Sequence, residues 1–161
     1  MPRRPFRIGR SLTGLGLFAT REIKKGARIA EYTGRRIRNS EADKHERRGN
    51  RYLFEINKEW TIDGTPRSNI ARYANHSCNP NAEPYSWRSR MFIRARRRIK
   101  PGEEITYHYG MDYLRNVIGI SNCRCGRCRR RKARQARERY ARKRRAQTRR
   151  KAAGRKGQGR R

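Results

Sequence analysis

The sequence predicts a mainly β domain with few short helices, followed by a basic extension that has no core of its own. Over the first 110 residues or so, runs of four to eight residues rich in Ile, Tyr, Phe and Thr alternate with Gly and Pro. Residues 129–161 differ sharply, with 18 Lys or Arg, one acid (Glu138) and one large apolar residue (Tyr140). We expect this segment to be disordered alone and helical only when its charge is neutralised.

The β pattern divides into six expected strands, at residues 7–12, 27–34, 51–56, 59–63, 91–95 and 104–109. One helix is expected over residues 39–48, because Ser40 could cap it and its first acids suit the positive end of a helix dipole. A short helical turn is expected over 68–73. In the last strand, a period of two places Tyr107 and Tyr109 on one face and His108 on the other.

Net charge sets the class of partner. Among 161 residues, 46 are basic and 13 acidic, which gives +33, and 33% are hydrophobic. This length supports one ordinary domain, and no apolar run approaches the roughly 18–20 residues of a membrane span, so no membrane partner is expected. The uncharged run 11–20 follows several arginines like a targeting signal, but its two glycines and lack of a clear cleavage site favour an intracellular protein.

The four cysteines are Cys78, Cys123, Cys125 and Cys128, and the last three form the pattern C-x-C-x2-C. A zinc site, free thiols and two disulfides are all compatible with this count. Zinc is favoured, because a disulfide among three cysteines so close together would close a very short loop.

Two segments carry polar and aromatic residues in unusual density. Residues 71–83 read ARYANHSCNPNAE, and residues 101–110 read PGEEITYHYG. On local chemistry alone, the first is a set of turns whose side chains satisfy their own backbone, and the second holds two ordinary core tyrosines.

Taken together, four segments in order resemble the SET-domain family of protein lysine methyltransferases: GLGLFA at 14–19, EYTG at 31–34, NHSCNPN at 75–81 and GEEITYHYG at 102–110. The resemblance covers about residues 6–128. It implies small curved β-sheets in which the NHSC segment and the final tyrosine strand meet in a pseudoknot. It also implies a SET domain at 6–113 and a post-SET-like zinc segment at 114–128, with the Arg/Lys-rich tail at 129–161.

The resemblance further implies the activity of an S-adenosylmethionine-dependent protein-lysine N-methyltransferase. Roles follow position by position: Tyr109 is catalytic; Gly14, Leu15, Gly16, Tyr52, Arg72, Asn75 and His76 bind S-adenosyl-L-methionine; Tyr32 and Tyr107 line the lysine channel; Cys78, Cys123, Cys125 and Cys128 bind one Zn²⁺. The hydroxyl of Tyr107 takes space beside the amine, so mono- or dimethylation is expected.

Three positions depart from the family pattern. Two residues separate Cys125 from Cys128 where four are usual, Arg35 replaces an acid, and His108 replaces an Asp. The first departure puts the zinc site in question, and all three blur the substrate.

The expected partners are a protein with a target lysine and a nucleic acid. A protein of +33 repels a basic substrate such as a histone or ribosomal protein, unless both meet on DNA or rRNA that the tail binds. The expected location is the cytoplasm or nucleoid of a bacterium, or the nucleus of a eukaryote. A non-catalytic basic nucleic-acid-binding protein with a zinc knuckle is the alternative.

Overall fold

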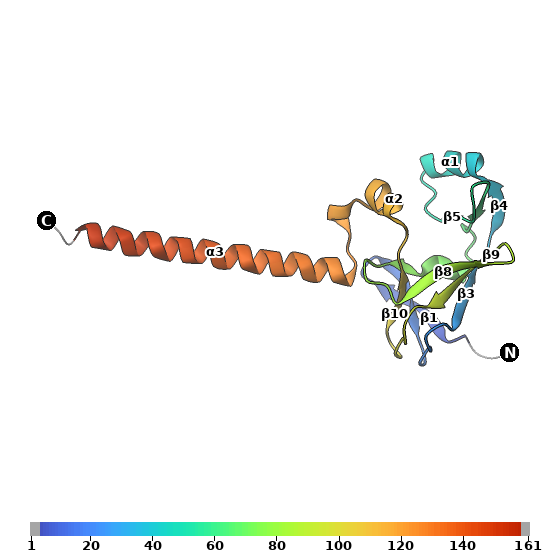
Figure 1. Cartoon of the computed structure of the whole chain (residues 1–161), viewed down its shortest axis with the longest axis horizontal. Helices are drawn as coiled ribbons and strands as arrows, with labels where there is room; N and C mark the ends of the chain where they lie inside the picture. The colour runs from blue at the N-terminus through green and yellow to red at the C-terminus, as the bar shows by residue number, and fades with distance from the viewer. Residues whose placement is uncertain (1–3, 159–161) are drawn as a thin grey trace.

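Three small β-sheets carry the fold in the computed structural model, which describes residues 4–158, with side chains for 4–148 (Figure 1). The first sheet has the order β1 (Phe6–Ser11), β2 (Gly14–Ala19), β10 (Glu104–Tyr107), β7 (Asn75–His76). The second has the order β3 (Arg28–Tyr32), β9 (Arg90–Ala95), β8 (Ala82–Trp87), and the third β4 (Arg35–Arg38), β6 (Trp60–Asp63), β5 (Leu53–Glu55). The expected mainly β fold is confirmed.

Strand β10 joins two distant parts of the chain. It pairs antiparallel with β2 and parallel with β7, with Thr106 opposite Asn75 and Tyr107 opposite His76. The expected meeting of the NHSC segment with the final tyrosine strand is therefore confirmed.

One buried cluster spans the sheets. Its fully buried members come from β2, β9, β10 and the Ile99 segment, namely Leu17, Ile93, Ile99 and Ile105. These apolar side chains remove the inner sheet faces from water, which is the main driving force for the fold. A second, smaller cluster holds Leu114 and three of the cysteines.

Four strands were not expected from the sequence: β2, β4, β7 and β8. Glycines interrupt β2, charges dominate β4, and β7 has two residues only. Strand β8 contains Pro84, which is tolerated because β8 is the edge of its sheet. Here tertiary pairing overrides weak local propensity.

The expected helix is confirmed as α1 (Asn39–Arg47), but Ser40 does not cap it. The backbone N–H of Asn39 donates to the carbonyl of Glu59 at 3.0 Å, so the helix begins directly at the end of β4 and Ser40 lies inside it. The expected turn is confirmed as the 3₁₀ helix η1 (Ile70–Tyr73). Short helical segments α2 (Met111–Tyr113), η2 (Leu114–Ile118) and η3 (Ile120–Asn122) follow β10.

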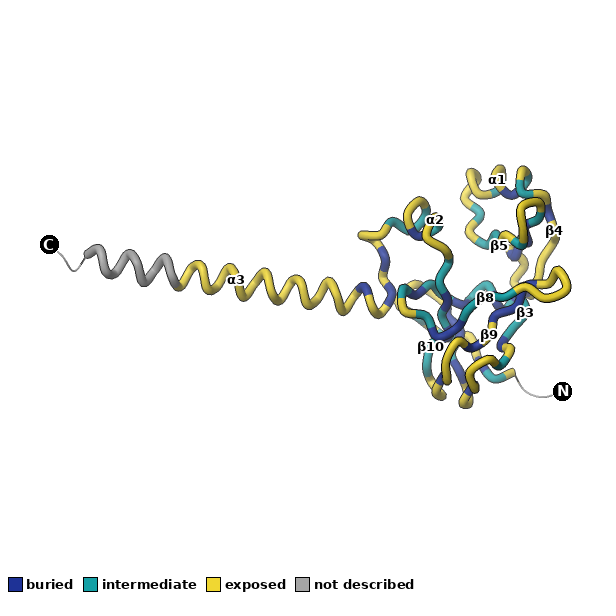
Figure 2. Tube along the Cα trace, viewed as in Figure 1, coloured by how far each residue is buried: buried dark blue, intermediate teal, exposed yellow. Residues whose placement is uncertain are grey.

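The basic extension differs from the expected disorder. It forms one helix, α3 (Gly126–Gln158), which projects away from the sheets (Figure 1). Every residue from Arg129 to Thr148 is exposed (Figure 2). Ala, Arg, Lys and Gln have high helix propensity, and Arg134 pairs with Glu138 one turn on at 3.6 Å, so local preference outweighs the missing apolar face.

Among residues 4–158, no helix combines the length and apolar character needed to cross a membrane.

We predict that Asn81→Ala lowers the free energy of unfolding by about 1–3 kcal/mol, because buried partners on β10 lose their hydrogen bonds. Asn81 is 4% exposed; its Nδ2 donates to the carbonyl of Glu104 at 2.8 Å and its Oδ1 accepts from the N–H of Thr106 at 2.9 Å. Urea denaturation measures the change. Exposed Asn79→Ala, two residues away, is the control. Equal stability of the two variants would contradict this role.

Candidate functional site

A cavity of about 670 Å³ opens beside the junction of β7 and β10. It collects residues from the β1–β2 turn, β3, β5, η1 and the segment after β10. Its lining residues are Thr13, Gly14, Leu15, Tyr32, Arg51, Tyr52, Leu53, Phe54, Glu55, Arg72, Tyr73, Asn75, Pro84, Tyr107, His108, Tyr109, Gly110 and Tyr113. The fold thus brings together most of the residues that the sequence singled out.

Aromatic rings form one wall of this cavity. Phe54 lies 5.1 Å from Tyr32 and 6.2 Å from Tyr107, measured between ring centroids. Tyr109 lies 4.8 Å from Tyr107 and 5.4 Å from Tyr113. Such a wall offers an apolar passage with a few hydroxyl groups, which suits an alkyl chain ending in a polar group.

The tyrosine hydroxyls of this wall stay protonated at physiological pH. Burial raises the pKa of Tyr32, Tyr107 and Tyr109 above the ordinary value, so none acts as an anionic base. The hydroxyl of Tyr109 donates to the carbonyl of Ala74 at 2.8 Å. Since its one proton is committed to this bond, the oxygen keeps its lone pairs for groups in the cavity.

The β1–β2 turn borders the cavity and is tied to Asn75. The Nδ2 of Asn75 donates to the carbonyl of Leu15 at 3.0 Å and to Oε1 of Glu104 at 2.7 Å. Gly14 has φ +113°, which favours glycine, and it lines the cavity. Gly16 lies outside the lining; a Cβ there would lie 2.5 Å from the Glu104 carboxylate, so this glycine leaves room for the Asn75–Glu104 pair.

Arg72 brings a positive charge to the wall of the cavity. Its guanidinium lies 3.5 Å from the ring centroid of Tyr52, and one of its terminal nitrogens donates to the carbonyl of Thr65. Its Nε is buried and has no hydrogen-bond partner among the described residues. An orphaned donor at the cavity wall indicates that a ligand or water completes it.

His76 faces a second, smaller cavity of about 260 Å³, which also borders Thr13, Asn75 and Tyr109. Its Nδ1 accepts a hydrogen bond from the N–H of Tyr109 at 3.3 Å. Burial, and secondarily the charge of His108, lowers the pKa of His76 to about 4. His76 is therefore neutral at physiological pH and positions the backbone of Tyr109.

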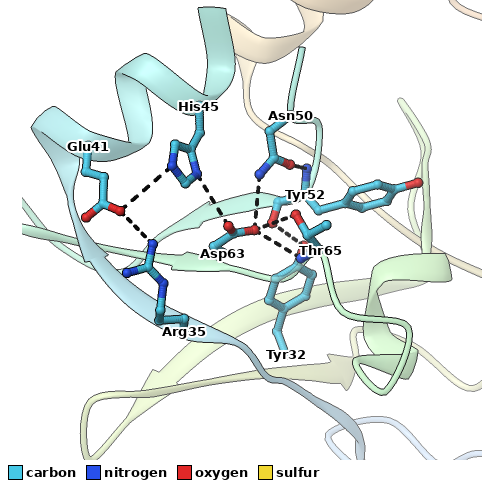
Figure 3. A network of polar contacts seen from close by, with 8 residues as sticks. All are labelled: Tyr32, Arg35, Glu41, His45, Asn50, Tyr52, Asp63 and Thr65. Carbon is cyan, nitrogen blue, oxygen red and sulfur yellow. Dashed lines mark hydrogen bonds and ion pairs between the residues drawn. The ribbon is translucent and has the colours of Figure 1, made fainter. Parts of the chain in front are cut away.

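A polar network stands behind two of the cavity tyrosines (Figure 3). The hydroxyl of Tyr32 donates to the carbonyl of Tyr52 at 3.0 Å, and the N–H of Tyr52 donates to Oδ1 of Asn50 at 2.9 Å. Asn50 in turn donates to Asp63 at 3.1 Å, and His45 lies 3.4 Å from the same carboxylate. Helix α1 is thereby coupled to the positions of Tyr32 and Tyr52.

The four cysteines form the second cluster. The Sγ atoms of Cys78, Cys123, Cys125 and Cys128 all lie within 4.8 Å of one another. The Sγ of Cys78 lies 3.9 Å from that of Cys123 and 3.6 Å from that of Cys128. Zn–S bonds of about 2.3 Å in a tetrahedron require S···S distances of about 3.8 Å. The shortened spacing therefore still brings four thiols to metal-binding separation.

The protonation of these thiols also fits a metal site. Burial raises the pKa of Cys78 and Cys123. For Cys125, burial also acts to raise the pKa, but backbone N–H groups of Cys78 and Cys128 and the neighbouring thiols lower it to about 7. Four thiols in one cluster cannot all ionise without a cation, and a bound metal would supply that charge.

The alternation expected around His108 is wrong at its end. Strand β10 stops at Tyr107, so the period of two ends there, and His108 lines the cavity together with both tyrosines. Sequence reasoning also missed Phe54 and Tyr113 in the wall, since an isolated aromatic residue reads as ordinary core. Asn81, expected to satisfy its own backbone, instead holds β10.

Comparison with known proteins identifies the fold family. A family model described as the SET domain matches residues 14–110, more than half of the chain. The chain belongs to the SET-domain family. The lining of the cavity contains the motif residues of this family that the sequence shows, among them Gly14, Asn75 and Tyr109.

Named relatives of this SET-domain chain are histone-lysine methyltransferases. It is 40% identical over 124 residues to human "Histone-lysine N-methyltransferase 2D", a match covering 71% of this chain and 2% of that protein. It is 39% identical over 124 residues to "Histone-lysine N-methyltransferase ASHH3" of Arabidopsis thaliana, covering 70% of this chain and 33% of that one. The chain thus spans a small part of these relatives.

Solved structures show the same domain. A humanized mutant of the Chaetomium thermophilum Polycomb Repressive Complex 2 matches with a TM-score of 0.58 and 30% identity, over 73% of this chain and 16% of that chain. A second structure, of ctPRC2, matches with a TM-score of 0.60 and 29% identity, over 74% of this chain and 16% of that one.

We predict that Asp63→Asn lowers the melting temperature at pH 7 by about 3–6 °C, since charge-assisted hydrogen bonds are worth roughly 1–2 kcal/mol more than neutral ones. Although burial acts to raise it, hydrogen bonds from Thr65 and Asn50 hold the pKa of Asp63 below its ordinary value. The stabilisation is therefore complete above the unfolded pKa of about 3.9 and is lost as pH falls through the folded pKa.

Calorimetry at pH 7 and below pH 4 measures this difference, which should shrink on acidification. Exposed Asp43→Asn on α1 is the matched control. A difference between wild type and Asp63→Asn that persists unchanged at low pH would assign the effect to shape instead of charge.

Proposed function

We propose that this SET-domain chain is an S-adenosylmethionine-dependent protein-lysine N-methyltransferase. The observation that carries the proposal is the pairing of β7 with β10, which sets Asn75 and Tyr109 on the border of one cavity walled by aromatic rings. We propose a lysine of a nucleic-acid-associated protein, such as a histone or a ribosomal protein, as substrate. The names of the relatives support the histone.

The cavity residues fit S-adenosylmethionine. Gly14 and Leu15 offer backbone without a wall of side chain, Asn75 offers an amide, and the free Nε of Arg72 offers a buried donor. His76 and the smaller cavity provide a place for an aromatic base. When bound, the cofactor supplies a methyl group carried on a sulfonium.

The aromatic wall prepares the lysine. An amine with an ordinary pKa of about 10.4 must lose its proton before it can attack a methyl group. Tyr32, Phe54 and Tyr107 offer little solvation to an ammonium, and the Arg72 guanidinium adds positive charge at the wall. Both effects lower the pKa of the amine.

Tyr109 orients the reacting groups. With its proton held by Ala74, its oxygen accepts from the amine and faces the positively polarised methyl group. No covalent enzyme intermediate is needed, so positioning provides most of the acceleration.

Tyr109→Phe should retain cofactor binding and lose at least about 10²-fold in methyl transfer, the scale expected for removing one oriented polar group from a reaction centre. Isothermal titration with S-adenosylmethionine and label transfer to histones and whole-cell protein measure the two properties. Tyr85→Phe, on β8 outside the cavity lining, is the control. Wild-type turnover in the Tyr109 variant would remove this residue from its role, and absent cofactor binding in wild type would favour the non-catalytic alternative.

The wild type should produce mainly mono- or dimethyl-lysine, because the Tyr107 hydroxyl takes space beside the amine. Tyr107 is 7% exposed, so its hydroxyl cannot swing out into solvent. Tyr107→Phe should therefore move the product distribution toward trimethyl-lysine, as read by mass spectrometry of the modified substrate. A wild-type spectrum dominated by trimethyl-lysine would refute this assignment.

We propose that the four cysteines hold one Zn²⁺. Zinc should be present in purified protein at about one equivalent by elemental analysis, the stoichiometry of a closed four-thiolate site. Cys128→Ser should reduce the zinc content, whereas the exposed Ser121→Ala in the same segment should not. Freshly purified wild type without zinc would reject the site.

We further propose that the basic extension binds nucleic acid, DNA or RNA, and so brings the enzyme to its substrate. Its 18 basic side chains support many phosphate contacts. The relatives named above are eukaryotic histone methyltransferases, which supports the nucleus and chromatin as the location and gives no support to a bacterial one.

A further inference from the structure

The basic helix α3 has charge on every side. Between Arg129 and Arg145 the chain has eleven basic residues and one acid, Glu138. At 3.6 residues per turn, neighbouring basic side chains around the helix axis are separated by at most about 60°. All of these residues are exposed, as Figure 2 shows along the whole described length. A helix that lies on a flat partner would need only one charged face.

The start of this helix is fixed to the cysteine cluster. Cys128 belongs to the cluster and lies in the first turn of α3. Arg127 donates to the carbonyl of Cys78 at 3.1 Å, and Lys132 donates to the carbonyls of Ser121 at 2.6 Å and Cys123 at 3.2 Å. The helix therefore leaves the domain in a set direction, two residues along the chain from His76 at its Cys78 anchor.

A partner that surrounds a helix with phosphate has a specific shape. An α-helix with side chains is about 10–12 Å across, and the major groove of B-form DNA is about 12 Å wide with phosphates on both sides. The A-form major groove of duplex RNA is too deep and narrow for this. Single strands are bound through stacked aromatic residues, and this helix has one, Tyr140.

We propose that α3 lies in the major groove of duplex DNA and binds its phosphates without reading sequence, a proposal that rests on the function proposed above and names the nucleic acid. Residues 129–148 span about 30 Å, or roughly nine base pairs. The anchored start of the helix then holds the cavity beside the duplex. A basic protein tail that is itself attracted to DNA meets the cavity there without long-range repulsion.

Fluorescence anisotropy of the zinc-loaded full chain tests this with three labelled probes of mixed sequence: a 20-base-pair DNA duplex, its single strand, and the RNA duplex of the same sequence. The DNA duplex should bind tightest. Its affinity should fall about 10³-fold or more between 50 and 200 mM salt, as for six or more phosphate contacts. Equal or tighter binding of the single strand or the RNA duplex would overturn the proposal.

Variants locate the binding surface. Replacing Arg137, Arg139 and Arg142 with Gln should weaken duplex binding about 10-fold or more at 100 mM salt, since each neutralised phosphate that a substitution removes lowers the salt slope by about 0.9. Replacing the exposed Arg47, Arg48 and Arg67 of the domain with Gln removes the same charge and should change affinity less than about 2-fold. Equal weakening in both sets would show general attraction to a +33 protein and reject α3 as the site.

Groove ligands complete the test. Netropsin, which fills the minor groove, should not displace the protein from an A·T-rich duplex, whereas glucosylated 5-hydroxymethylcytosine in the major groove should weaken binding. The reverse pattern would contradict the major groove. Methylation of a free lysine peptide without DNA is measured in parallel: if it proceeds while duplex binding fails, the proposal fails and the proposed function stands.

Discussion

The parallel pairing of β7 with β10 is the contact on which the site depends. It is only two residues long, yet it joins Asn75 and His76 to a strand about thirty residues later. So short a pairing contributes little by itself, and it is held by neighbours. Asn81 bonds β10 on both sides of Ile105, and the N–H of Ser77 donates to the carbonyl of Tyr107 at 2.9 Å. Because these polar groups are buried, the wrong register would leave them unpaired.

From that pairing the rest of the site follows in both directions along the chain. Before β7, Ala74 receives the hydroxyl of Tyr109 and Arg72 reaches the cavity wall. After it, Cys78 enters the cysteine cluster, which also includes the start of α3. The cavity, the metal-binding cluster and the basic helix are thus connected through fewer than ten residues, so a change in one is transmitted through short, well-packed segments.

Charge is divided between two environments. Inside the cavity the tyrosines remain neutral because burial opposes ionisation. On the outer face of the second sheet, acids are paired with arginines, as in Glu83 with Arg94 at 2.9 Å. The unpaired positive charge is concentrated on α3, at a distance from the reaction centre, where it can bind a polyanion without disturbing the protonation of the cavity.

The sequence predicts the parts of this protein that depend on motifs, and misses those that depend on tertiary context. NHSC and the final tyrosines could be recognised because their residue types and order are unusual. Phe54 could not, since a single aromatic residue carries no positional signal before folding. The interruption of alternation at His108 arises because β10 ends where its partner β7 ends. The helix over 126–158 was also missed, because its stability comes from backbone propensity without an apolar pattern.

A crystal structure with S-adenosylhomocysteine and a lysine-containing peptide tests the central claim most directly. The account predicts that the cofactor contacts Leu15, Asn75 and His76, and that the lysine amine approaches its sulfur past the Tyr109 hydroxyl. A cofactor bound away from the β7–β10 junction, or a lysine side chain outside the aromatic wall, would contradict it.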